Sequence, residues 1–522
     1  MRRAVALGIA ASLAIPVSAH ADTVLVLDGV ADAGEPDHFF VDFDVPAGTA
    51  EIQIEHDDLS DTDILDWGLY DPSGFRGWGG GNTEPIVIDA DAASRSYLTG
   101  SITPGTWRLV VGKAKLDSDG GAYHAVITLR EATTLAPQPE RAPYADPGAV
   151  VSGARWYAGD FHVHSRESGD ARPSLDEIVA FAKSRGLDFV ELSDHNTTSQ
   201  LDFMVDAQSR AGDFLLLPGV EFTTYAGHAN GIGATAFVDH KIGQPGVTID
   251  GAVDAFHDMG ALFSINHPAL DLGDVCIGCA WKHELTASKV DAVEIATAGS
   301  AIIFINDALA FWERLCDGGH HIAALGGSDD HTAGTDIGPF GAPIGSPATY
   351  VYADELSVSA ILDAVRAGRT VVKVRGPEDP MIELSRRASD TSPTGLSLTA
   401  TITGPSAGLQ ARWVKNGAAG DFIPIDGDGA ELSLDVDPIA DGAEDRYRLE
   451  LWEGTNPVTF TSHVWLSASD VQQTSDPETV TPAGGVQCSA RPPSAESYTP
   501  AVVALFAAVT ILFGVRRRAR II

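Results

Sequence analysis

Cysteine and basic residues are both scarce in this chain. Four cysteines among 522 residues exclude a small scaffold stapled by disulfides. The chain has 34 Lys and Arg residues against 72 Asp and Glu, which gives a formal net charge of -38 at pH 7. Because such a charge repels phosphate polymers, we expect no nonspecific binding of nucleic acid. No internal repeat is evident, and the length exceeds one ordinary core, so we expect several domains.

Both ends of the chain carry apolar runs that indicate export. Residues 1–21 have a basic start, an apolar stretch and the small-x-small site Ala19-His20-Ala21, which together predict a secretory signal peptide. The tail at 499–515 contains an apolar run from Ala501 to Val515, which would span roughly 22 Å as a helix, a little less than a hydrocarbon core of about 30 Å. The basic end at 516–522 would then lie in the cytoplasm. This tail predicts either a one-pass membrane anchor or a processed sorting signal similar to those of bacterial surface proteins, so we expect the protein in the periplasm or at the cell surface.

The part between these ends divides by its hydrophobic pattern. Short alternating apolar runs predict β-sandwiches on both sides of a region in which strand-like and helical runs alternate, as in an α/β layer or barrel. The predicted parts are an N-terminal β-sandwich (22–135), a linker (136–155), a central α/β domain (156–376), a C-terminal β-sandwich (377–467) and a disordered linker (468–498). Ser174 and Glu177 have the spacing of a capping box and predict a helix from Leu175 to the residue before Gly186.

Three of the cysteines are close in sequence. Cys276 and Cys279 form a C-x-x-C pair, and Cys316 follows. In an oxidising compartment a structural disulfide among these three is the first expectation. A zinc site and a redox pair are the alternatives.

The central part contains an ordered series of metal-ligand residues. His162 and His164 alternate along a strand and therefore point to the same side, where two imidazoles can bind one divalent ion. Most of the later motifs follow a short apolar run that predicts a strand, and ligands at the carboxyl ends of strands are typical of a barrel-type active site. These motifs are Leu192-Ser193-Asp194-His195-Asn196, Pro218-Gly219-Val220-Glu221, Gly227-His228-Ala229-Asn230, Ile265-Asn266-His267-Pro268 and Gly327-Ser328-Asp329-Asp330-His331.

These motifs resemble those of the polymerase and histidinol phosphatase (PHP) superfamily, and the chain looks most like its exported, carbaryl-hydrolase-like branch. The resemblance implies a distorted (β/α)7 barrel, here flanked by two β-sandwiches, with two or three divalent ions (Mn, Zn or Fe) at its mouth. The implied first set of ligands is His162, His164, Glu221 and Asp329. The second set is Glu221, His228 and His267, with the Glu221 carboxylate bridging. The third set is Asp170, His195 and His331.

Further residues near the motifs have predicted supporting roles. Asp194 and Asn196 flank His195, and all three are predicted catalytic residues that orient a ligand or contact the leaving group. Asp160 is expected to support His162 from the same strand face. Arg166 and Lys282 are candidate contacts for an anion.

Three functions follow as hypotheses. The first is a metal-dependent phosphoesterase, in which a metal-bridging hydroxide attacks small phosphate esters. The second is a metal-dependent hydrolase of carboxyl esters, amides or carbamates, which would need an apolar slot instead of basic residues near the metals. The third is a cell-surface protein with an inactive barrel, whose β-sandwiches bind glycans or another surface partner.

Overall fold

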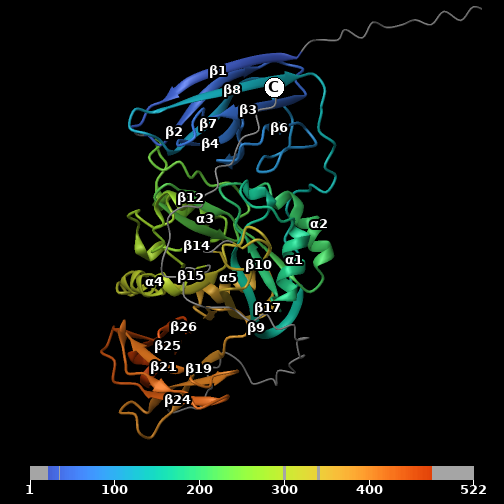
Figure 1. Cartoon of the computed structure of the whole chain (residues 1–522). Helices are drawn as coiled ribbons and strands as arrows, with labels where there is room; N and C mark the ends of the chain where they lie inside the picture. The colour runs from blue at the N-terminus through green and yellow to red at the C-terminus, as the bar shows by residue number, and fades with distance from the viewer. Residues whose placement is uncertain (1–21, 35, 298–300, 338–340, 473–522) are drawn as a thin grey trace, which may run out of the picture. The chain divides into compact units, whose positions relative to one another are not determined.

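The computed structural model describes residues 22–34, 36–297, 301–337 and 341–472 (Figure 1). All of these belong to one compact unit, Met1–Ala483, and the second unit of the chain, Gly484–Ile522, lies outside them. The predicted signal peptide, the C-terminal apolar tail and its basic end also lie outside the described residues. Among the described residues, no helix is both long and apolar enough to cross a membrane.

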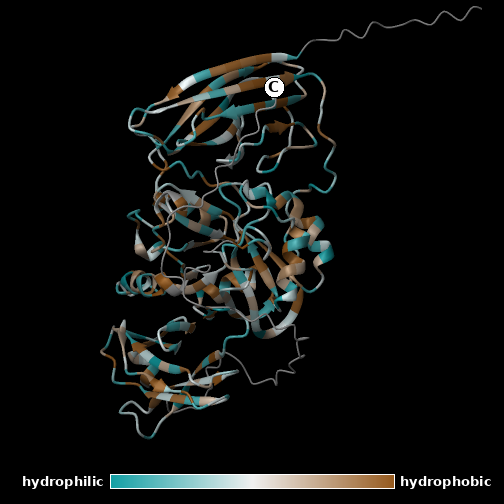
Figure 2. Cartoon of the chain, in the orientation of Figure 1, coloured by the Kyte–Doolittle hydropathy of each residue, from teal (hydrophilic) through white to brown (hydrophobic). Residues whose placement is uncertain are grey.

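Two antiparallel sheets form the N-terminal part, in the orders β1-β8-β3-β6 and β2-β7-β4-β5. Both sheets contribute to one hydrophobic core around Ile54, Leu69 and Trp107, as expected for a two-layered β-structure. Figure 2 shows apolar and polar residues alternating in bands along these strands. The strands are β1 (Thr23–Ala31), β2 (His38–Val45), β3 (Glu51–Asp57), β4 (Ile64–Asp71), β5 (Gly74–Gly80), β6 (Ile86–Ile88), β7 (Gly105–Lys115) and β8 (Gly121–Arg130).

The central part is a mixed α/β structure with more strands than helices. Parallel strands β9, β10 and β11 begin one sheet, and a second sheet has the order β12-β13-β14-β15-β16. The strands are β9 (Val151–Val163), β10 (Phe189–Leu192), β11 (Leu215–Pro218), β12 (Glu221–Thr224), β13 (Gly227–Ile232), β14 (Leu262–Ile265), β15 (Ala292–Thr297), β16 (Ala323–Gly327), β17 (Ala348–Leu356) and β18 (Thr370–Lys373). The helices are η1 (Arg166–Ser168), α1 (Leu175–Ser184), α2 (Leu201–Ala211), α3 (Ile249–Asp258), η2 (Gly273–Val275), η3 (Ala287–Lys289), α4 (Ala301–Cys316) and α5 (Val358–Arg366).

A complete (β/α)7 barrel is not evident in the part of the chain that the structure describes. Only the pairs within β9–β10–β11 and β14–β15–β16 are parallel, whereas β12–β13, β13–β14, β9–β17 and β17–β18 are antiparallel. The physical reason is connection length. Two residues join β12 to β13, and so short a connection makes a hairpin and leaves no room for a crossover helix.

Local sequence signals explain where several central elements begin and end. The Ser174 side chain accepts a hydrogen bond from the Glu177 backbone N–H, and the Glu177 carboxylate accepts one from the Ser174 N–H, so the predicted capping box is confirmed. The helix ends before Gly186, whose φ of 79° is easily adopted by glycine. Buried residues of α1 and α2 pack with β10 and β11 in one core cluster, which fixes the edge of the sheet that leads to His195.

The C-terminal strands continue the first central sheet. Strand β18 pairs with β26, so that one sheet has the order β11-β10-β9-β17-β18-β26-β25-β21-β22, with β27 beside β25 and β23 beside β21. A smaller sheet, β19-β20-β24, shares a hydrophobic core with it. These strands are β19 (Met381–Ala388), β20 (Leu396–Thr403), β21 (Gln410–Lys415), β22 (Ala418–Ala419), β23 (Ile423–Pro424), β24 (Ala430–Asp435), β25 (Glu444–Glu453), β26 (Asn456–Thr461) and β27 (Val464–Ser467).

Two segments differ from the sequence-based expectation. The last residues of the predicted linker 136–155 already belong to β9, and Arg141 in this linker pairs with Asp202 at 3.0 Å. The predicted disordered segment 468–498 begins with helix α6 (Ala468–Gln472), and the rest of it lies outside the described residues.

Candidate metal centre

The predicted ligands come together where strands of the two central sheets end. His162 lies in β9 and His164 follows that strand directly, while Glu221 begins β12. Isolated bridges between Val163 and Asp330 and between His195 and Glu221 join the two sheets at this point. The ligands from loops and from the second sheet are Asp170 after η1, His195 after β10, His228 in β13, His267 after β14, and Asp329 and His331 after β16.

Within the described residues, four overlapping groups of side chains could each hold a divalent ion. In each group the ligand atoms lie within 4.8 Å of one another. The groups are His162/His164/Glu221/Asp329, His164/Asp170/His195/His331, His228/His267/Cys279 and His162/His267/Glu294. Because the Cys279 sulfur is joined to Cys276 and is no thiolate, the third group offers His228 and His267, the two histidines of the predicted second set. The first group is the predicted first ligand set, and the second is the predicted third set with His164 added.

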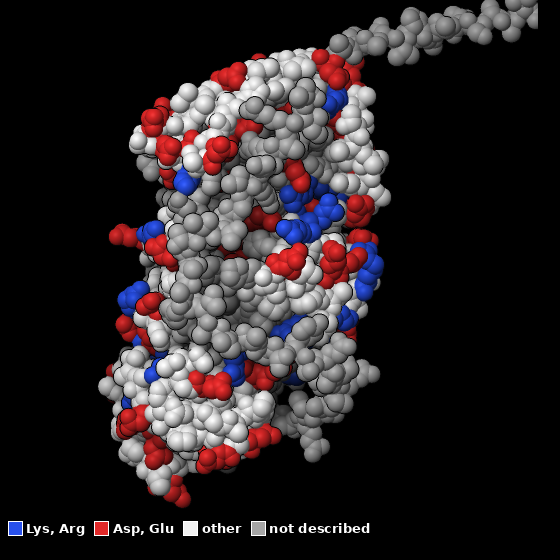
Figure 3. Space-filling view, in the orientation of Figure 1, with Lys and Arg blue, Asp and Glu red and all other residues white. Residues whose placement is uncertain are grey.

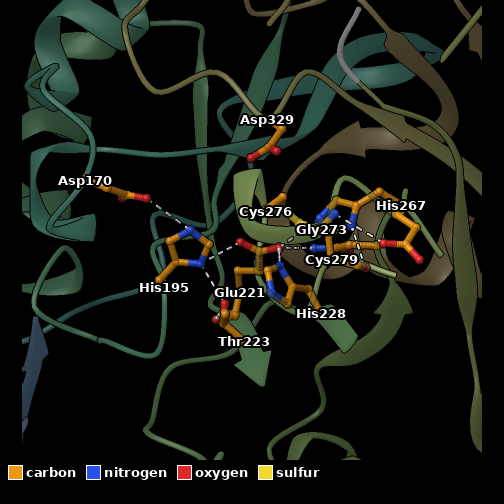
Figure 4. Close-up of a disulfide and its surroundings, with 12 residues drawn as sticks. Asp170, His195, Glu221, Thr223, His228, His267, Gly273, Cys276, Cys279 and Asp329 are labelled. Carbon is orange, nitrogen blue, oxygen red and sulfur yellow. Dashed lines mark hydrogen bonds and ion pairs between the residues drawn. A yellow bond between two sulfur atoms is a disulfide. The ribbon is translucent and has the colours of Figure 1, made fainter. Parts of the chain in front are cut away.

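The Glu221 carboxylate lies at the centre of the site. Its Oε1 is 3.3 Å from His162 Nε2, 3.2 Å from His228 Nδ1 and 3.4 Å from His267 Nε2. Its Oε2 faces the other side, 2.8 Å from His195 Nδ1 and 3.5 Å from His164 Nε2. Figure 4 shows Glu221 between His195 on one side and His228 and His267 on the other. One carboxylate with an oxygen toward each half of the site has the geometry of a bridging ligand.

Two aspartates, Asp170 and Asp329, each face the imidazoles of two histidines. Asp170 Oδ2 lies 3.4 Å from His195 Nε2 and 3.3 Å from His331 Nε2. Asp329 Oδ1 lies 3.3 Å from His162 Nε2 and 3.1 Å from His164 Nε2. The predicted third set, Asp170, His195 and His331, is therefore brought together. Asp329 links it to the predicted first set, which includes His162 and His164.

Five of the histidines are held through Nδ1, and in all five the Nε2 atom faces at least one ligand carboxylate, that of Glu221, Asp329 or Asp170. Such a second contact fixes the tautomer and the orientation of a metal-binding imidazole. The Nδ1 contacts are His162 to Glu294 Oε1 at 3.2 Å, His164 to Ser168 Oγ at 3.1 Å, His195 to Thr223 Oγ1 at 2.6 Å, His267 to the Cys279 carbonyl at 3.1 Å and His331 to the Asp329 carbonyl at 2.9 Å. Sequence analysis missed Ser168, Thr223 and Glu294.

The missed Glu294 had a visible signal in the sequence. It interrupts the apolar run of strand β15, where a buried charge has a cost unless it is paired. Its Oε2 accepts a hydrogen bond of 2.9 Å from the His267 backbone N–H, in addition to the contact with His162.

Unsatisfied atoms in the site test whether these residues fit metal ions. His162 Nε2, His164 Nε2, His228 Nε2 and Glu221 Oε2 are buried and make no hydrogen bond within the described residues. Buried polar atoms normally have partners, and each that lacks one needs an explanation. Imidazole nitrogens and carboxylate oxygens are the donors that Zn, Mn and Fe accept. The residues present therefore fit divalent ions.

The electrostatics of the centre favour charged histidines when no ion is bound. Burial opposes charge, but Asp329, Glu221 and Glu294 together raise the pKa of His162 well above its usual value. Burial likewise opposes charge on His331, but Asp170 raises its pKa to about 9. In the same way, His195 and His162 outweigh burial and hold the pKa of Glu221 well below its usual value. Burial instead lowers the pKa of His164 to about 3 and lowers that of His228, so positive charge is favoured on only some of the ligand histidines.

Backbone strain occurs at two of the ligands, His267 and Asp329, and at Asn196 beside the ligand His195. Asn196, His267 and Asp329 have φ values of 50°, 29° and 55°, which residues other than glycine rarely adopt. Such conformations persist only where the surrounding structure fixes them, and they cluster at functional sites.

The other predicted site residues support the ligands instead of joining the four groups. Asp194 is buried and accepts hydrogen bonds from the Ser165 N–H and hydroxyl at 2.6 and 2.7 Å. Asn196 bridges to both backbone groups of Thr223 in β12, at 2.8 and 2.9 Å. Asp160 accepts from the backbone N–H groups of His162, Ser328 and Gly345, which ties β9 to the segment that carries Asp329.

The two candidate anion contacts lie apart from the ligand carboxylates. Arg166 has a side chain that is 63% exposed and faces Glu167 at 3.9 Å. Lys282 donates its backbone N–H to the Ala226 carbonyl in the β12–β13 turn. Among the described residues, every ion pair of Glu221 and Asp329 is with a histidine.

The cysteines show the expected disulfide. Cys276 and Cys279 are joined, and Cys316 is a buried free thiol whose pKa burial raises to about 12 (Figure 4 shows the disulfide). The disulfide belongs to the segment that holds His267, because the Cys279 carbonyl faces the Nδ1 of that ring.

No protein-family model matches this chain, and no curated protein matches it. Similar solved structures include a two-domain protein from Bacteroides vulgatus that contains a predicted PHP-like metal-dependent phosphoesterase, at 18% identity over 63% of this chain and 100% of that chain, with a TM-score of 0.37. They also include a candidate metal-dependent phosphoesterase from Bifidobacterium adolescentis (15% identity, 40% and 94% coverage, TM-score 0.26) and an amidohydrolase from Chromobacterium violaceum (18%, 35% and 93%, TM-score 0.24). At such low identities and TM-scores, these likenesses support neither a substrate nor a mechanism for this chain.

Proposed function

We propose that this protein is a metal-dependent hydrolase of the PHP type that cleaves small phosphate esters. The observation that carries the proposal is the position of the Glu221 carboxylate, with one oxygen toward His162, His228 and His267 and the other toward His164 and His195. The proposal includes membership of the carbaryl-hydrolase-like branch.

The proposed location is outside the cytoplasm. Support for it comes from the sequence alone, namely the predicted signal peptide (1–21) and the apolar tail with its basic end (499–522). A membrane contact through that tail, and a glycan or surface partner for the β-sandwiches, belong to the same proposal.

The chain's own residues would perform distinct tasks. His162, His164, Glu221 and Asp329 would hold one ion, His228 and His267 with Glu221 a second, and Asp170, His195 and His331 a third. When bound, the ions would activate water as a nucleophile and neutralise charge on the oxygens of the scissile group. Glu221 would be shared between ions, because its Oε1 faces His162, His228 and His267 and its Oε2 faces His164 and His195. Asp194 and Asn196 would keep His195 in place through their bonds to Ser165 and Thr223.

One observation favours a second candidate, the hydrolysis of carboxyl esters, amides or carbamates. Within the described residues the ligand carboxylates pair only with histidines, and Arg166 is largely exposed. A phosphate pocket commonly adds Arg or Lys to the metals, since their donors match phosphate oxygens. Three ions could by themselves supply the positive charge that a phosphate ester needs, which is why we place the phosphoesterase first.

The test compares three chromogenic substrates. The purified protein, loaded with Mn or Zn, would be assayed on p-nitrophenyl phosphate, bis-p-nitrophenyl phosphate and p-nitrophenyl acetate. His195→Ala serves as the blank, and His124→Ala is the matched control because His124 lies in β8, outside the four groups. We expect turnover of a phosphate substrate that His195→Ala abolishes and His124→Ala leaves unchanged.

The other outcomes are equally definite. Turnover of the acetate alone, lost in His195→Ala, would replace the phosphoesterase by the ester and carbamate hydrolase. A rate that His195→Ala does not change, on any substrate, would contradict a catalytic role for this centre.

A further inference from the structure

Ser96, in the N-terminal β-part, contacts two of the loops that carry ligands. Its backbone N–H donates to Glu167 Oε2 at 3.1 Å, and its hydroxyl donates to the Glu167 carbonyl at 2.7 Å. Its own carbonyl accepts from the Thr197 hydroxyl at 3.0 Å. Glu167 lies three residues before Asp170, and Thr197 lies two residues after His195. All three of these hydrogen bonds are buried.

The loop that contains Glu167 also contacts two of the histidine ligands, through Ser168. The neighbouring Ser168 hydroxyl lies 3.1 Å from His164 Nδ1 and accepts from the His195 backbone N–H at 3.2 Å. The bonds of Ser96 therefore fix a loop whose next residue orients two ligands. Ser96 is 0% exposed and has a φ of 73°, a strained conformation for serine.

Close backbone packing occurs beside this contact. A Cβ on Gly169 would lie 2.8 Å from the Gly79 carbonyl and 3.5 Å from Ser96 Oγ, and Gly169 has a φ of 84°. Arg95 adds a hydrogen bond of 3.0 Å to the Ala171 carbonyl. The segment around Asp170 is therefore held against the N-terminal β-part on both sides of the ligand.

Strand β4 of the N-terminal β-part contacts the hairpin that carries Glu221 and His228. The Tyr225 hydroxyl, at the β12–β13 turn, donates to Asp66 Oδ2 of β4 at 2.7 Å. A Cβ on Gly112 of β7 would lie 2.2 Å from that hydroxyl, so glycine leaves the space that Tyr225 occupies. Asp66 is close enough to the centre for the charges of His195 and Asp170 to act on it.

From these contacts we infer that the N-terminal β-part belongs to the metal centre, and that Ser96 is a positioning residue for the ion that Asp170, His195 and His331 would hold. Asp170 and His195 come from different loops, and Ser96 is a residue bonded to both loops. This inference rests on the metal centre of the proposed function, but it does not depend on the substrate. It gives the N-terminal strands a role other than the binding of a glycan or surface partner.

The experiment measures metal affinity in the full chain. Ser96→Gly removes the hydroxyl and suits the positive φ, so the local backbone is not strained further. Thr197→Val removes the second bond. Thr106→Ala is the control, because the Thr106 side chain is exposed and its hydroxyl donates to Asp44 in the same β-part. Apo protein would be titrated with Zn or Mn, and bound metal counted by elemental analysis after dialysis.

We expect Ser96→Gly/Thr197→Val to weaken one metal equivalent by roughly 10- to 100-fold, as the loss of outer contacts of ligands commonly does. The remaining equivalents and the thermal midpoint of the apo protein should match those of Thr106→Ala. Unchanged affinity for every equivalent would overturn the inference. Equal weakening of all equivalents together with a lowered apo midpoint would also overturn it, because the bonds would then serve only general stability. A substrate panel without turnover would leave this result intact and count only against the proposed function.

Discussion

At the scale of single residues, the centre depends on side chains that hold the ligands as much as on the ligands themselves. Five histidines have their Nδ1 atoms fixed by another group, and only some of these partners could be expected from the sequence. The motifs predict which residues bind metal ions, because a series of histidines and carboxylates at the ends of successive strands is rare outside metal sites. They do not predict Ser168 or Thr223, because a serine or threonine in a loop has many ordinary roles.

Glu294→Gln should weaken metal binding without unfolding the protein. Glutamine keeps the shape of Glu294 but loses the charge that faces His162 Nδ1 at 3.2 Å. We expect metal affinity to fall by roughly 10- to 100-fold, measured by competition with a chromogenic chelator. Glu431→Gln, an exposed change in β24 that breaks only a pair with Arg387, should have no effect. Equal affinities in the two variants would show that Glu294 does not position His162.

Metal binding should release protons. In the metal-free protein, neighbouring carboxylates outweigh burial, raise the pKa of His162 and His195 well above its usual value and raise that of His331 to about 9, so these three rings carry protons at pH 7. Burial lowers the pKa of His164 to about 3 and also lowers that of His228, so these two rings do not contribute released protons. A ligand imidazole must be neutral, so apparent affinity should increase as the pH rises toward about 9 and decrease as it falls. Calorimetric titration at pH 7 in two buffers with different ionisation enthalpies measures the proton count. A binding heat that is the same in both buffers would contradict this assignment.

At the scale of elements, the sequence predicts the ends of a helix best where a residue type has one specific structural role there. The capping box of α1 and its glycine stop are such signals, and both were confirmed. The hairpin β12–β13 was not predicted, because its strands are short and almost completely buried and therefore lack the alternation that marks an exposed strand. Helix α2 was missed because Gln200 at its N-cap makes no side-chain capping bond.

Ser174→Ala should destabilise the first turn of α1. The change removes the side-chain oxygen that accepts the Glu177 N–H, at a cost of about 1 kcal/mol. Amide hydrogen exchange in the first turn should become faster by the corresponding factor. Ser184→Ala, at the other end of the same helix, is the matched control. If both variants exchange at the same rate, the capping box does not contribute to the stability of this turn.

At the scale of the whole molecule, acidity separates this protein from those that bind phosphate polymers. The net charge is -38, and Figure 3 shows acidic side chains scattered over the visible face, with basic ones gathered near its middle. Sequence analysis predicted the α/β character of the centre and the β-structure on both sides of it. It could not predict that β18 pairs with β26, because pairing between distant strands is decided by packing that no local pattern records.

The same charge predicts that DNA is not a ligand. In a mobility-shift assay at low salt, where electrostatic attraction is strongest, neither single-stranded nor duplex DNA should be retained. Binding that weakens steeply with added salt would contradict this expectation.

Metal content is the most direct test of the central claim. The purified protein would be loaded with Zn or Mn, dialysed and analysed for metal per chain, alongside Glu221→Gln and the control Glu431→Gln. We expect two or three metal equivalents per chain in the natural protein and in the control. Glu221→Gln should lose at least one equivalent, because the two oxygens of that carboxylate face different histidine ligands, His162 and His195. Less than one equivalent in the natural protein, or equal content in all three, would contradict a multi-metal centre built on Glu221.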